Sequence, residues 1–497
     1  MGIAIIVLLI LGGVAAWVCK NDKTARLIAL AVTAVDAVLA VVMTMNVASN
    51  GEQVMRFGSG FIEQSIRIGK IECFMACIFG IIGFLIVWAS MSMISHDVEE
   101  RLIPFYYFLV LALLGTLNAV VFFESMIGIF VSIELSSFAA AGIVIVKNQT
   151  ENVHAGLKYL SLSILGSSLV LMGMVLLYVA TGSLMISGIG EVVQGSGFMA
   201  QNSAYVVWAM SLITGGVAFK AALFPCHIWL PDAHGTAPSP SSATLSALVL
   251  KAYIVFYMKM MFRGVGFEVI ASSGIRTLLN VVMVVGVVAM ICGSLLAIMQ
   301  TDIKRMIAYS SVAQMGYIFM GIGIGTEFGL FAALFHILAH AVTKSGLFLV
   351  AGSVIEQTHN RDLTKMGGLG RIMPITMALF TIGGLSMIGI PLFVGFNSKW
   401  NFATGIVDSA NYWLLIPLSI SALLNALYYL PVVIRAFFGQ EAKEMSEKEK
   451  FGAKERPVKD LLPIILLAVG VIIFGVAAGP VSDFLHSGIE LLTSIGH

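Results

Sequence analysis

Long runs of apolar residues, separated by short polar segments, fill almost the whole chain. A helix needs about 20 apolar residues to cross a bilayer core about 30 Å thick. Lipid offers no partner to backbone N–H and C=O groups, so such runs must form helices or a closed barrel. The apolar residues here are consecutive and do not alternate with polar ones, which favours helices. Fourteen runs are counted, at residues 2–19, 27–48, 72–94, 104–123, 126–146, 155–180, 205–224, 241–262, 276–299, 306–325, 328–355, 373–407, 412–438 and 461–484.

The composition supports an all-α polytopic membrane protein. Of the 497 residues, 59% are hydrophobic and only 11% are charged, against about 25% charged residues in a soluble protein. This excludes a cytosolic enzyme, a nucleic-acid-binding protein and a disordered chain. The run at Gly2–Val18 lacks a basic start and a small-residue cleavage site, so we interpret it as a membrane span and not as a signal peptide.

Basic residues are distributed unevenly over the segments that connect the runs. With fourteen spans, the odd-numbered connections carry eighteen Lys and Arg residues, Lys304 among them. The even-numbered connections carry six, namely Arg56, Arg67, Lys70, Lys259, Arg263 and Arg276. The positive-inside rule then predicts that both termini lie outside the cell. Residues 440–460, the only strongly charged stretch, are predicted to form an amphipathic helix on the cytoplasmic surface.

The cysteines do not indicate a cofactor. The five of them lie in or beside apolar runs, with no C-x-x-C motif and no Cys/His cluster. An iron–sulfur cluster or a zinc ion needs several convergent ligands. Cys73 and Cys77 are best interpreted as small core residues, and we predict neither a cofactor nor a metal.

Five charged residues within the apolar runs are selected as candidates: Glu134, Lys220, Lys251, Lys344 and Lys399. Each costs about 2.5–3.5 kcal/mol at the centre of a membrane, so five of them suggest water, partners and a function. Burial disfavours the charged form of lysine and of glutamate, so both can change protonation when a neighbour moves. A Glu–Lys pair that opens and closes would act as a proton switch. Snorkelling or structural pairing is the alternative.

Two histidines and a lysine are spaced four residues apart in the run at 328–355. His336, His340 and Lys344 therefore stack on one helix face, about 6 Å apart along the axis. That separation suits one bridging water, and the ladder is interpreted as a proton relay. A zinc pair is the alternative by spacing, but no third ligand is near in sequence.

Prolines predict interrupted helices beside two of the lysines. Pro225 and Pro231 follow Lys220, and Pro391 precedes Lys399. Unwound backbone at membrane depth is tolerated where protein covers it or where it lines water. A plain proline kink is the alternative. Gly-Gly pairs at 215–216 and 383–384 each precede such a break and suggest two related halves.

Several stretches together resemble one family. They are AGLKYL at 155–160, FKAALFPCHIWLPDAHGTAP at 219–238, DIKRMIAYSSV at 302–312, the His336/His340/Lys344 ladder and GFNSKW at 395–400. This pattern is similar to the antiporter-like membrane subunits shared by respiratory complex I, membrane-bound hydrogenases and Mrp-type sodium/proton antiporters. The resemblance covers roughly residues 100–440.

The resemblance implies fourteen helices, with two inverted five-helix repeats and discontinuous seventh and twelfth helices. The expected parts are an N-terminal three-helix segment (1–100), a first repeat (101–262), a second repeat (263–440) and a final segment (441–497). It also implies a proton path through Glu134, Lys220, Lys251, His336, His340, Lys344 and Lys399. His227, Asp232, Pro225 and Pro391 are expected to support it, and Ser246 stands where some members have a histidine. Glu124 is interpreted as structural or as a rim residue.

The function implied is proton translocation in a multi-subunit complex of a prokaryotic cell membrane. The run around Lys399 and the short termini look most like the Mrp D-type subunit, whose complex exchanges Na⁺ for protons. No long lateral helix is expected after the last span. A proton-pumping subunit of a hydrogenase or a quinone oxidoreductase is the first alternative, and a membrane scaffold without transport is the second. Other membrane subunits, protons, Na⁺ and lipid are the expected partners, and nucleic acid is not.

Overall fold

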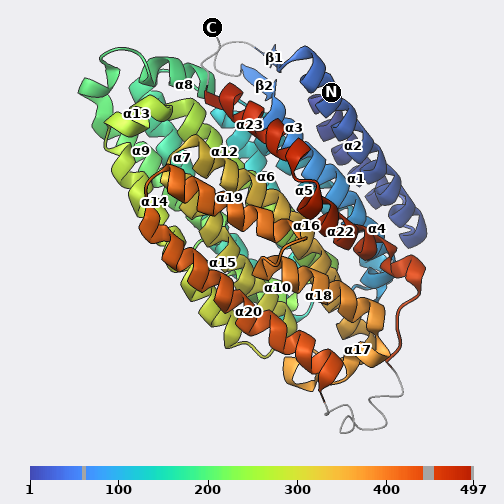
Figure 1. Ribbon diagram of the computed structural model, residues 1–497. Helices are drawn as coiled ribbons and strands as arrows, with labels where there is room; N and C mark the ends of the chain where they lie inside the picture. The colour runs from blue at the N-terminus through green and yellow to red at the C-terminus, as the bar shows by residue number, and fades with distance from the viewer. Residues whose placement is uncertain (59–62, 440–452, 494–497) are drawn as a thin grey trace.

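The apolar runs become long helices that lie side by side in an elongated bundle (Figure 1). The computed structural model describes residues 1–58, 63–439 and 453–493. The uninterrupted helices are α1 (Gly2–Val18), α2 (Asp22–Asn50), α5 (Ile103–Phe122), α6 (Met126–Ile145), α7 (Thr150–Thr181), α9 (Phe198–Lys220), α14 (Ile275–Ile298), α15 (Ile303–Ile324), α16 (Glu327–Thr358), α20 (Leu415–Phe438) and α22 (Val458–Val476).

Two further spans contain π-helical turns. The first is α3 (Lys70–Cys77), η2 (Ile78–Ile82) and α4 (Gly83–Asp97). The second is α11 (Ser239–Thr244), η4 (Leu245–Val249), α12 (Leu250–Met258) and η5 (Lys259–Val265). A π-helical turn holds one more residue than an α-helical turn and is rare outside functional sites. The sequence pattern does not predict these turns.

The remaining helices are short. They are α8 (Ile186–Val193), α10 (Leu230–Thr236), α13 (Phe267–Ser272), α17 (Leu369–Ile372), α18 (Pro374–Ile388), α19 (Val394–Asp408), α23 (Gly479–Thr493) and the 3₁₀ turns η3 (Glu100–Leu102), η6 (Leu363–Lys365) and η7 (Tyr412–Leu414). Strands β1 (Gln53–Phe57) and β2 (Gln64–Ile68) pair antiparallel, with Gln53 opposite Ile68. This hairpin lies at the same end of the bundle as the start of α1 and as α23 (Figure 1).

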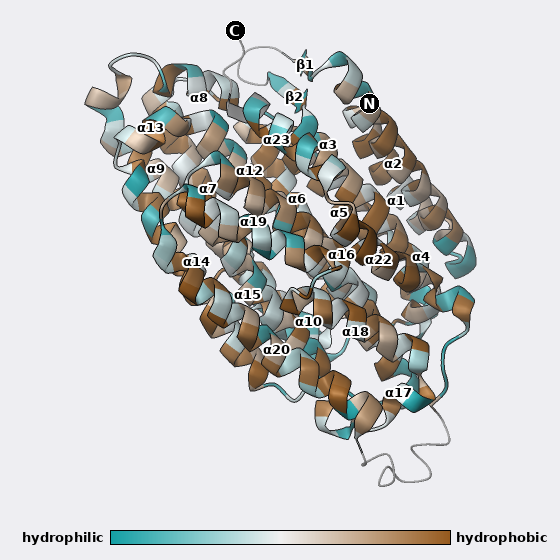
Figure 2. Cartoon of the chain, in the orientation of Figure 1, coloured by the Kyte–Doolittle hydropathy of each residue, from teal (hydrophilic) through white to brown (hydrophobic). Residues whose placement is uncertain are grey.

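The all-α membrane prediction is confirmed. Among the described residues, twelve helices are long and apolar enough to cross a membrane, and α1 and α18 are shorter apolar helices. Figure 2 shows hydrophobic residues along the length of the helices and hydrophilic ones gathered toward the two ends. The span from Ser239 to Val265 is completely enclosed by protein, whereas only a third of the apolar windows of α9, α20 and α22 is buried. The protein is therefore a multi-pass membrane protein with a protein-enclosed centre.

Small residues allow the helices around the centre to approach closely. A Cβ atom at Gly216 of α9 would lie 2.4 Å from the carbonyl oxygen of Gly166 on α7. That distance is shorter than any real contact, so a larger residue would force the two helices apart. The close approach brings α7 next to the end of α9, where Lys220 lies.

Both predicted helix interruptions are present. Helix α9 ends at Lys220, and regular helix resumes with α10 at Leu230. Across this break, the indole N–H of Trp229 donates a hydrogen bond to the carbonyl of Phe219 at 2.9 Å. Helix α18 ends at Ile388 and α19 begins at Val394. Gly389 adopts φ +93°, which suits glycine, and Leu392 adopts φ +81°. The prolines therefore mark true breaks and not kinks.

The predicted surface helix at 440–460 is only partly tested. Residues 440–452 lie outside the described residues. Residues 453–457 are not helical, and α22 begins at Val458. Within that stretch, the Glu455 carboxylate accepts hydrogen bonds from the backbone N–H groups of Ile375 and Thr376 at 2.7 and 3.3 Å, which satisfies free donors at the start of α18.

Candidate functional site

Six titratable side chains of the predicted path lie inside the bundle, on α9, α12, α16 and α19. Lys220, Lys251, His336, His340 and Lys344 are each at most 2% exposed. Lys399 is half-buried. The cost of placing such groups in an apolar interior is high unless each finds polar partners. The partners of each group therefore define what the path can do.

Lys220 ends α9 and points at serine hydroxyls of two neighbouring helices. Its Nζ lies 2.8 Å from Ser137 Oγ on α6 and 2.8 Å from Ser163 Oγ on α7. It also lies 5.2 Å from the centre of the Tyr253 ring, a geometry that favours the ammonium form. A serine hydroxyl can donate or accept, so the same pocket can hold the lysine with or without its proton.

Glu134 is on α6, three residues before Ser137, but it is not joined to Lys220. Among the described residues, no carboxylate oxygen lies within 4.0 Å of the Lys220 ammonium, although Glu134 is close enough to attract it. Glu134 Oε1 is buried without a hydrogen-bond partner. The predicted pair is therefore present as neighbours in an open arrangement.

Lys251 lies on α12 and has no acidic neighbour at hydrogen-bond distance in the part of the chain that the structure describes. Its Nζ donates to the backbone carbonyl of Ser246 in η4. The hydroxyl of Ser246 lies 3.0 Å from that of Ser311 on α15. Ser246 is thus part of the polar surroundings of Lys251.

His336, His340 and Lys344 all lie on α16, as the spacing predicts. The rings of His336 and His340 lie 6.2 Å apart. Both ring nitrogens of His340 are buried without a hydrogen-bond partner, whereas His336 Nδ1 lies 2.7 Å from Ser398 Oγ. Lys344 donates to the carbonyl of Ile307 at 2.9 Å and to the hydroxyl of Tyr429 at 3.2 Å. The imidazole rings of His336 and His340 are too far apart for direct proton transfer.

Lys399 lies beside the second break and points back at α18. Its Nζ donates to the carbonyl oxygens of Met387 and Ile388 at 2.9 and 2.6 Å. These carbonyls end a helix, where a cation is favoured by the helix dipole. The Tyr317 ring lies between the two parts of the path, because it stacks on His336 at 5.4 Å and lies 5.5 Å from Lys399 Nζ.

The supporting residues have structural positions. His227 lies in the first break and stacks on Phe224 at 5.1 Å. The Asp232 carboxylate is a third exposed and pairs with Lys158 at 2.7 Å and with Arg305 at 3.0 Å. Pro225 and Pro391 are exposed in the two breaks.

A polar cavity of about 170 Å³ opens at the end of the bundle opposite the hairpin. Asp97, Lys147, Glu356 and Arg361 line its outer part, and the buried Lys304 lies deeper. Its volume is enough for several water molecules. Lys304 is the second residue of α15, is 3% exposed and donates to the carbonyl of Ala237, so it is buried at the edge of the connection in which it was counted.

His234 is a buried group that the sequence analysis did not select. It lies on α10, stacks on Phe348 at 4.7 Å, and has no hydrogen-bond partner at either ring nitrogen. Lys304, Lys344 and Lys251 are all close enough to act on its charge. The next residue, Gly235, lines the cavity. The position of His234 in the stretch 219–238, which also contains His227, could have marked it as a candidate site residue.

A second set of buried charges lies at the hairpin end. Glu72, Glu124, Lys259 and Arg263 form ion pairs in which each side chain is at most 9% exposed. The prediction that Lys259 and Arg263 lie in a polar connection is wrong, because they belong to η5 inside the bundle. Arg263 follows Lys259 by four positions in the sequence, a spacing that could have indicated a shared helix face.

Asp36 is a further intramembrane acid that the sequence analysis did not select. It lies near the middle of α2, is 1% exposed, and has no hydrogen-bond partner at either carboxylate oxygen. Among the described residues, no group of three or more His, Cys, Asp or Glu side chains is placed to hold a metal ion. His336 and His340 offer two nitrogen ligands at most, which does not complete a zinc site.

Comparison with known proteins identifies the family. Residues 124–425 match the family described as "NADH:quinone oxidoreductase/Mrp antiporter, TM". The chain belongs to this family. The match begins at Glu124 and includes every member of the buried series from Glu134 to Lys399.

Two curated relatives within the family illustrate its range. The chain is 33% identical over 354 residues to NADH-quinone oxidoreductase subunit N of Desulforudis audaxviator, covering 70% of this chain and 69% of that protein. It is 31% identical over 442 residues to the A-type subunit of the Na(+)/H(+) antiporter of Alkalihalophilus pseudofirmus, covering 83% of this chain. The chain spans about half the length of that antiporter protein.

Two solved structures share the fold. A chain of the membrane-bound sulfane sulfur reductase, an archaeal respiratory membrane complex, superimposes with a TM-score of 0.88 at 25% identity, covering 99% of this chain and 98% of the other. A chain of the Mrp complex from Dietzia sp. DQ12-45-1b gives a TM-score of 0.85 at 20% identity, covering 99% and 97%. The family fold therefore extends over the whole of this chain.

Proposed function

We propose that this chain moves protons across the membrane as one subunit of a multi-subunit complex. The observation that carries the proposal is the series of buried lysines and histidines on α9, α12, α16 and α19, each lysine held by neutral polar groups. A purely structural charge is normally paired with an opposite charge. Lysines held by hydroxyl and carbonyl oxygens keep the ability to gain and lose a proton.

The proposed mechanism begins at the polar cavity. Water in the cavity would bring protons to Lys304 and His234, and from there to Lys251 and the α16 ladder. When Glu134 approaches Lys220, the ammonium form of Lys220 is stabilised. When Glu134 withdraws, as in the arrangement seen here, Lys220 gives up its proton more readily. Lys399 would then pass the proton to the other side of the membrane or to a neighbouring subunit.

Two settings fit this mechanism. In the first, the complex is a Mrp-type antiporter that exchanges Na⁺ for protons, as the names of the antiporter relatives suggest. In the second, electron transfer in partner subunits drives the chain as a pump. The similarity to a chain of a respiratory sulfur reductase and to a protein of NADH-quinone oxidoreductase supports the second setting. We propose a prokaryotic cell membrane as the location, with both termini outside.

Alanine substitution of the proposed switch tests the function. Lys220→Ala and Glu134→Ala should each abolish the proton gradient formed by inverted vesicles that contain the assembled complex, measured with a pH-sensitive dye. Lys365→Ala serves as the control, because Lys365 is exposed in η6. Full transport by both variants would refute the proposal.

Isolation of the complex separates the two settings. The complex would be extracted in mild detergent and its partners identified by mass spectrometry. Recovery of small membrane antiporter subunits alone would indicate cation exchange. Recovery of hydrophilic subunits that hold iron–sulfur clusters, flavin or nickel would indicate a redox-driven pump.

A further inference from the structure

The ion pairs at the hairpin end join three separate parts of the chain. Arg263 Nη1 lies 2.6 Å from Glu124 and 3.3 Å from Glu72, and Lys259 Nζ lies 3.5 Å from a carboxylate oxygen of each acid. Glu72 belongs to α3, Glu124 precedes α6, and both cations belong to η5. The two acids balance the two bases, so the cluster is neutral as a whole.

The cluster is held on several sides. Lys259 also donates to the carbonyls of Val121 and Phe123 at 2.8 and 3.0 Å. Glu72 accepts the backbone N–H of Gly69 at 3.0 Å. Toward the surface, Arg67 lies 4.0 Å from Glu124. Removing one partner would leave a buried charge without compensation, so the cluster fixes the position of η5 strongly.

The same continuous helix carries Lys251. Lys259 follows Lys251 by eight residues, about two turns or 12 Å along the axis. Helix α12, which holds Lys251, lies between two π-helical segments, η4 before it and η5 after it. Moving the extra residue of a π-helical turn from one side of α12 to the other would shift α12 by one residue, which turns it by about 100°.

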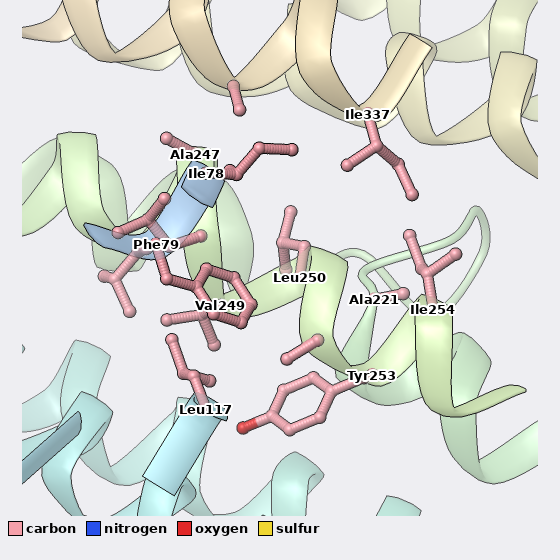
Figure 3. Close-up of a cluster of buried hydrophobic side chains, with 14 of the residues drawn as sticks. Ile78, Phe79, Leu117, Ala221, Ala247, Val249, Leu250, Tyr253, Ile254 and Ile337 are labelled. Carbon is pink, nitrogen blue, oxygen red and sulfur yellow. The ribbon is translucent and has the colours of Figure 1, made fainter. Parts of the chain in front are cut away.

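Such a turn would break the contacts of two tyrosine hydroxyls of α12, that of Tyr253 with Ser136 at 2.8 Å and that of Tyr257 with Thr214 at 3.1 Å. Figure 3 shows buried apolar side chains of this region, with Phe79 of η2 close to Val249 of η4. The whole span is enclosed by protein. The Lys251 side chain instead reaches back to the Ser246 carbonyl within η4. A turn of α12 would therefore change the neighbours of Lys251, while only the cluster on η5 opposes it with ionic contacts.

We propose that Glu72, Glu124, Lys259 and Arg263 form an ionic latch that holds η5, and with it the α12 segment carrying Lys251, in the register seen here. Opening of the latch is a step of transport, so the four charges are positioning residues for Lys251. The proposal rests on the proposed function, because it assigns a role in proton movement.

Lys259→Arg tests the latch by tightening it. Arginine offers a planar fork of donors that can serve both carboxylates, and it does not lose its proton. The assembled complex should then melt at the wild-type temperature or above it, while proton transport in inverted vesicles falls at least about fivefold. Lys70→Arg is the matched control, because Lys70 lies in the same helix as Glu72 but donates to Ser487 at the rim. Wild-type transport by assembled Lys259→Arg complex would overturn the latch.

A second variant tests the latch if an arginine at position 259 does not fit among the buried side chains. The double variant Glu72→Gln/Lys259→Gln keeps the cluster neutral and retains the Arg263–Glu124 pair. It should dissipate an imposed proton gradient faster than the wild type, because η5 is held less firmly. An assembled double variant with unchanged leak and rate would overturn the proposal. So would the failure of both variants to assemble, which would show a purely structural role.

Lys220→Ala, measured in the same vesicles, keeps the two proposals apart. If Lys220→Ala is inactive and Lys259→Arg transports normally, only the latch fails. If Lys220→Ala transports normally, the proposed function fails, whatever Lys259→Arg does.

Discussion

The two interrupted helices place a lysine beside each break, but they give it different partners. Lys220 is the last residue of α9 and contacts the side-chain hydroxyls of Ser137 and Ser163 on neighbouring helices. Lys399 lies inside α19 and contacts the backbone carbonyls of Met387 and Ile388 at the end of its own interrupted helix. The two helix interruptions therefore produce two chemically distinct lysine sites.

The difference indicates which lysine can switch. A hydroxyl both donates and accepts, so it can serve an ammonium or a neutral amine by rotating. A carbonyl only accepts and lies at the negative end of a helix, which suits the ammonium form better. Glu134 is near Lys220 and supplies the moving charge, so the first break suits a switch and the second suits a terminal proton carrier.

Lys220→Arg should cause the largest loss of proton transport, and it tests most directly whether Lys220 and Lys399 differ in function. Arginine keeps the positive charge but does not release its proton. Transport should fall at least about 100-fold, the lower range for losing a general acid–base group. The proton gradient formed by inverted vesicles is the measurement, with Lys365→Arg as the control. Near-normal transport would show that Lys220 holds a fixed charge and does not switch.

Lys399→Arg should give a smaller loss, about tenfold. The guanidinium can still donate to the carbonyls of Met387 and Ile388, so the break should remain intact and the complex should assemble normally. Only release of the terminal proton is impaired. The same vesicle assay applies, and Lys399→Gln, which keeps a donor without the charge, gives the matched comparison. A loss as large as that of Lys220→Arg would mean that both breaks contain switches.

Ser137→Ala/Ser163→Ala should lower transport about three- to tenfold. Each lost hydrogen bond is worth about 0.5–1.5 kcal/mol. Without the two hydroxyls, Lys220 should turn toward Glu134 and remain paired with it. Combining the double variant with Glu134→Gln separates this cause from misfolding. Recovery of part of the transport would support pairing, and a further loss would contradict it.

The fold followed from the sequence because lipid leaves so few choices. The apolar runs became helical, the run at 373–407 as the two helices α18 and α19, and Pro225 and Pro391 marked real breaks. The ladder of His336, His340 and Lys344 could be predicted because regular spacing on one helix fixes its own geometry. Features that depend on packing between distant segments could not be predicted in this way.

The buried ion pairs show why. Glu72 and Glu124 come from segments far from Lys259 and Arg263 in sequence, and only the folded bundle joins them. Counting basic residues near the ends of apolar runs placed the two cations in a connection, because the pattern does not reveal a partner that neutralises them. The π-helical turns around α12 and the open arrangement of Glu134 and Lys220 likewise depend on neighbouring helices.

Asp232→Asn should have the smallest effect on proton transport. It tests whether the Asp232 carboxylate, near the first break, has only a structural role. The Asp232 carboxylate pins α10 to Lys158 and Arg305, but it is a third exposed, and exposed ion pairs contribute about 0–1 kcal/mol. The melting temperature of the complex should fall by a few degrees at most, and transport should change less than twofold. High salt should reduce the difference from the wild type, because it screens exposed pairs. A tenfold loss of transport with unchanged melting would instead place Asp232 of α10 in the proton path, in addition to Glu134 of α6.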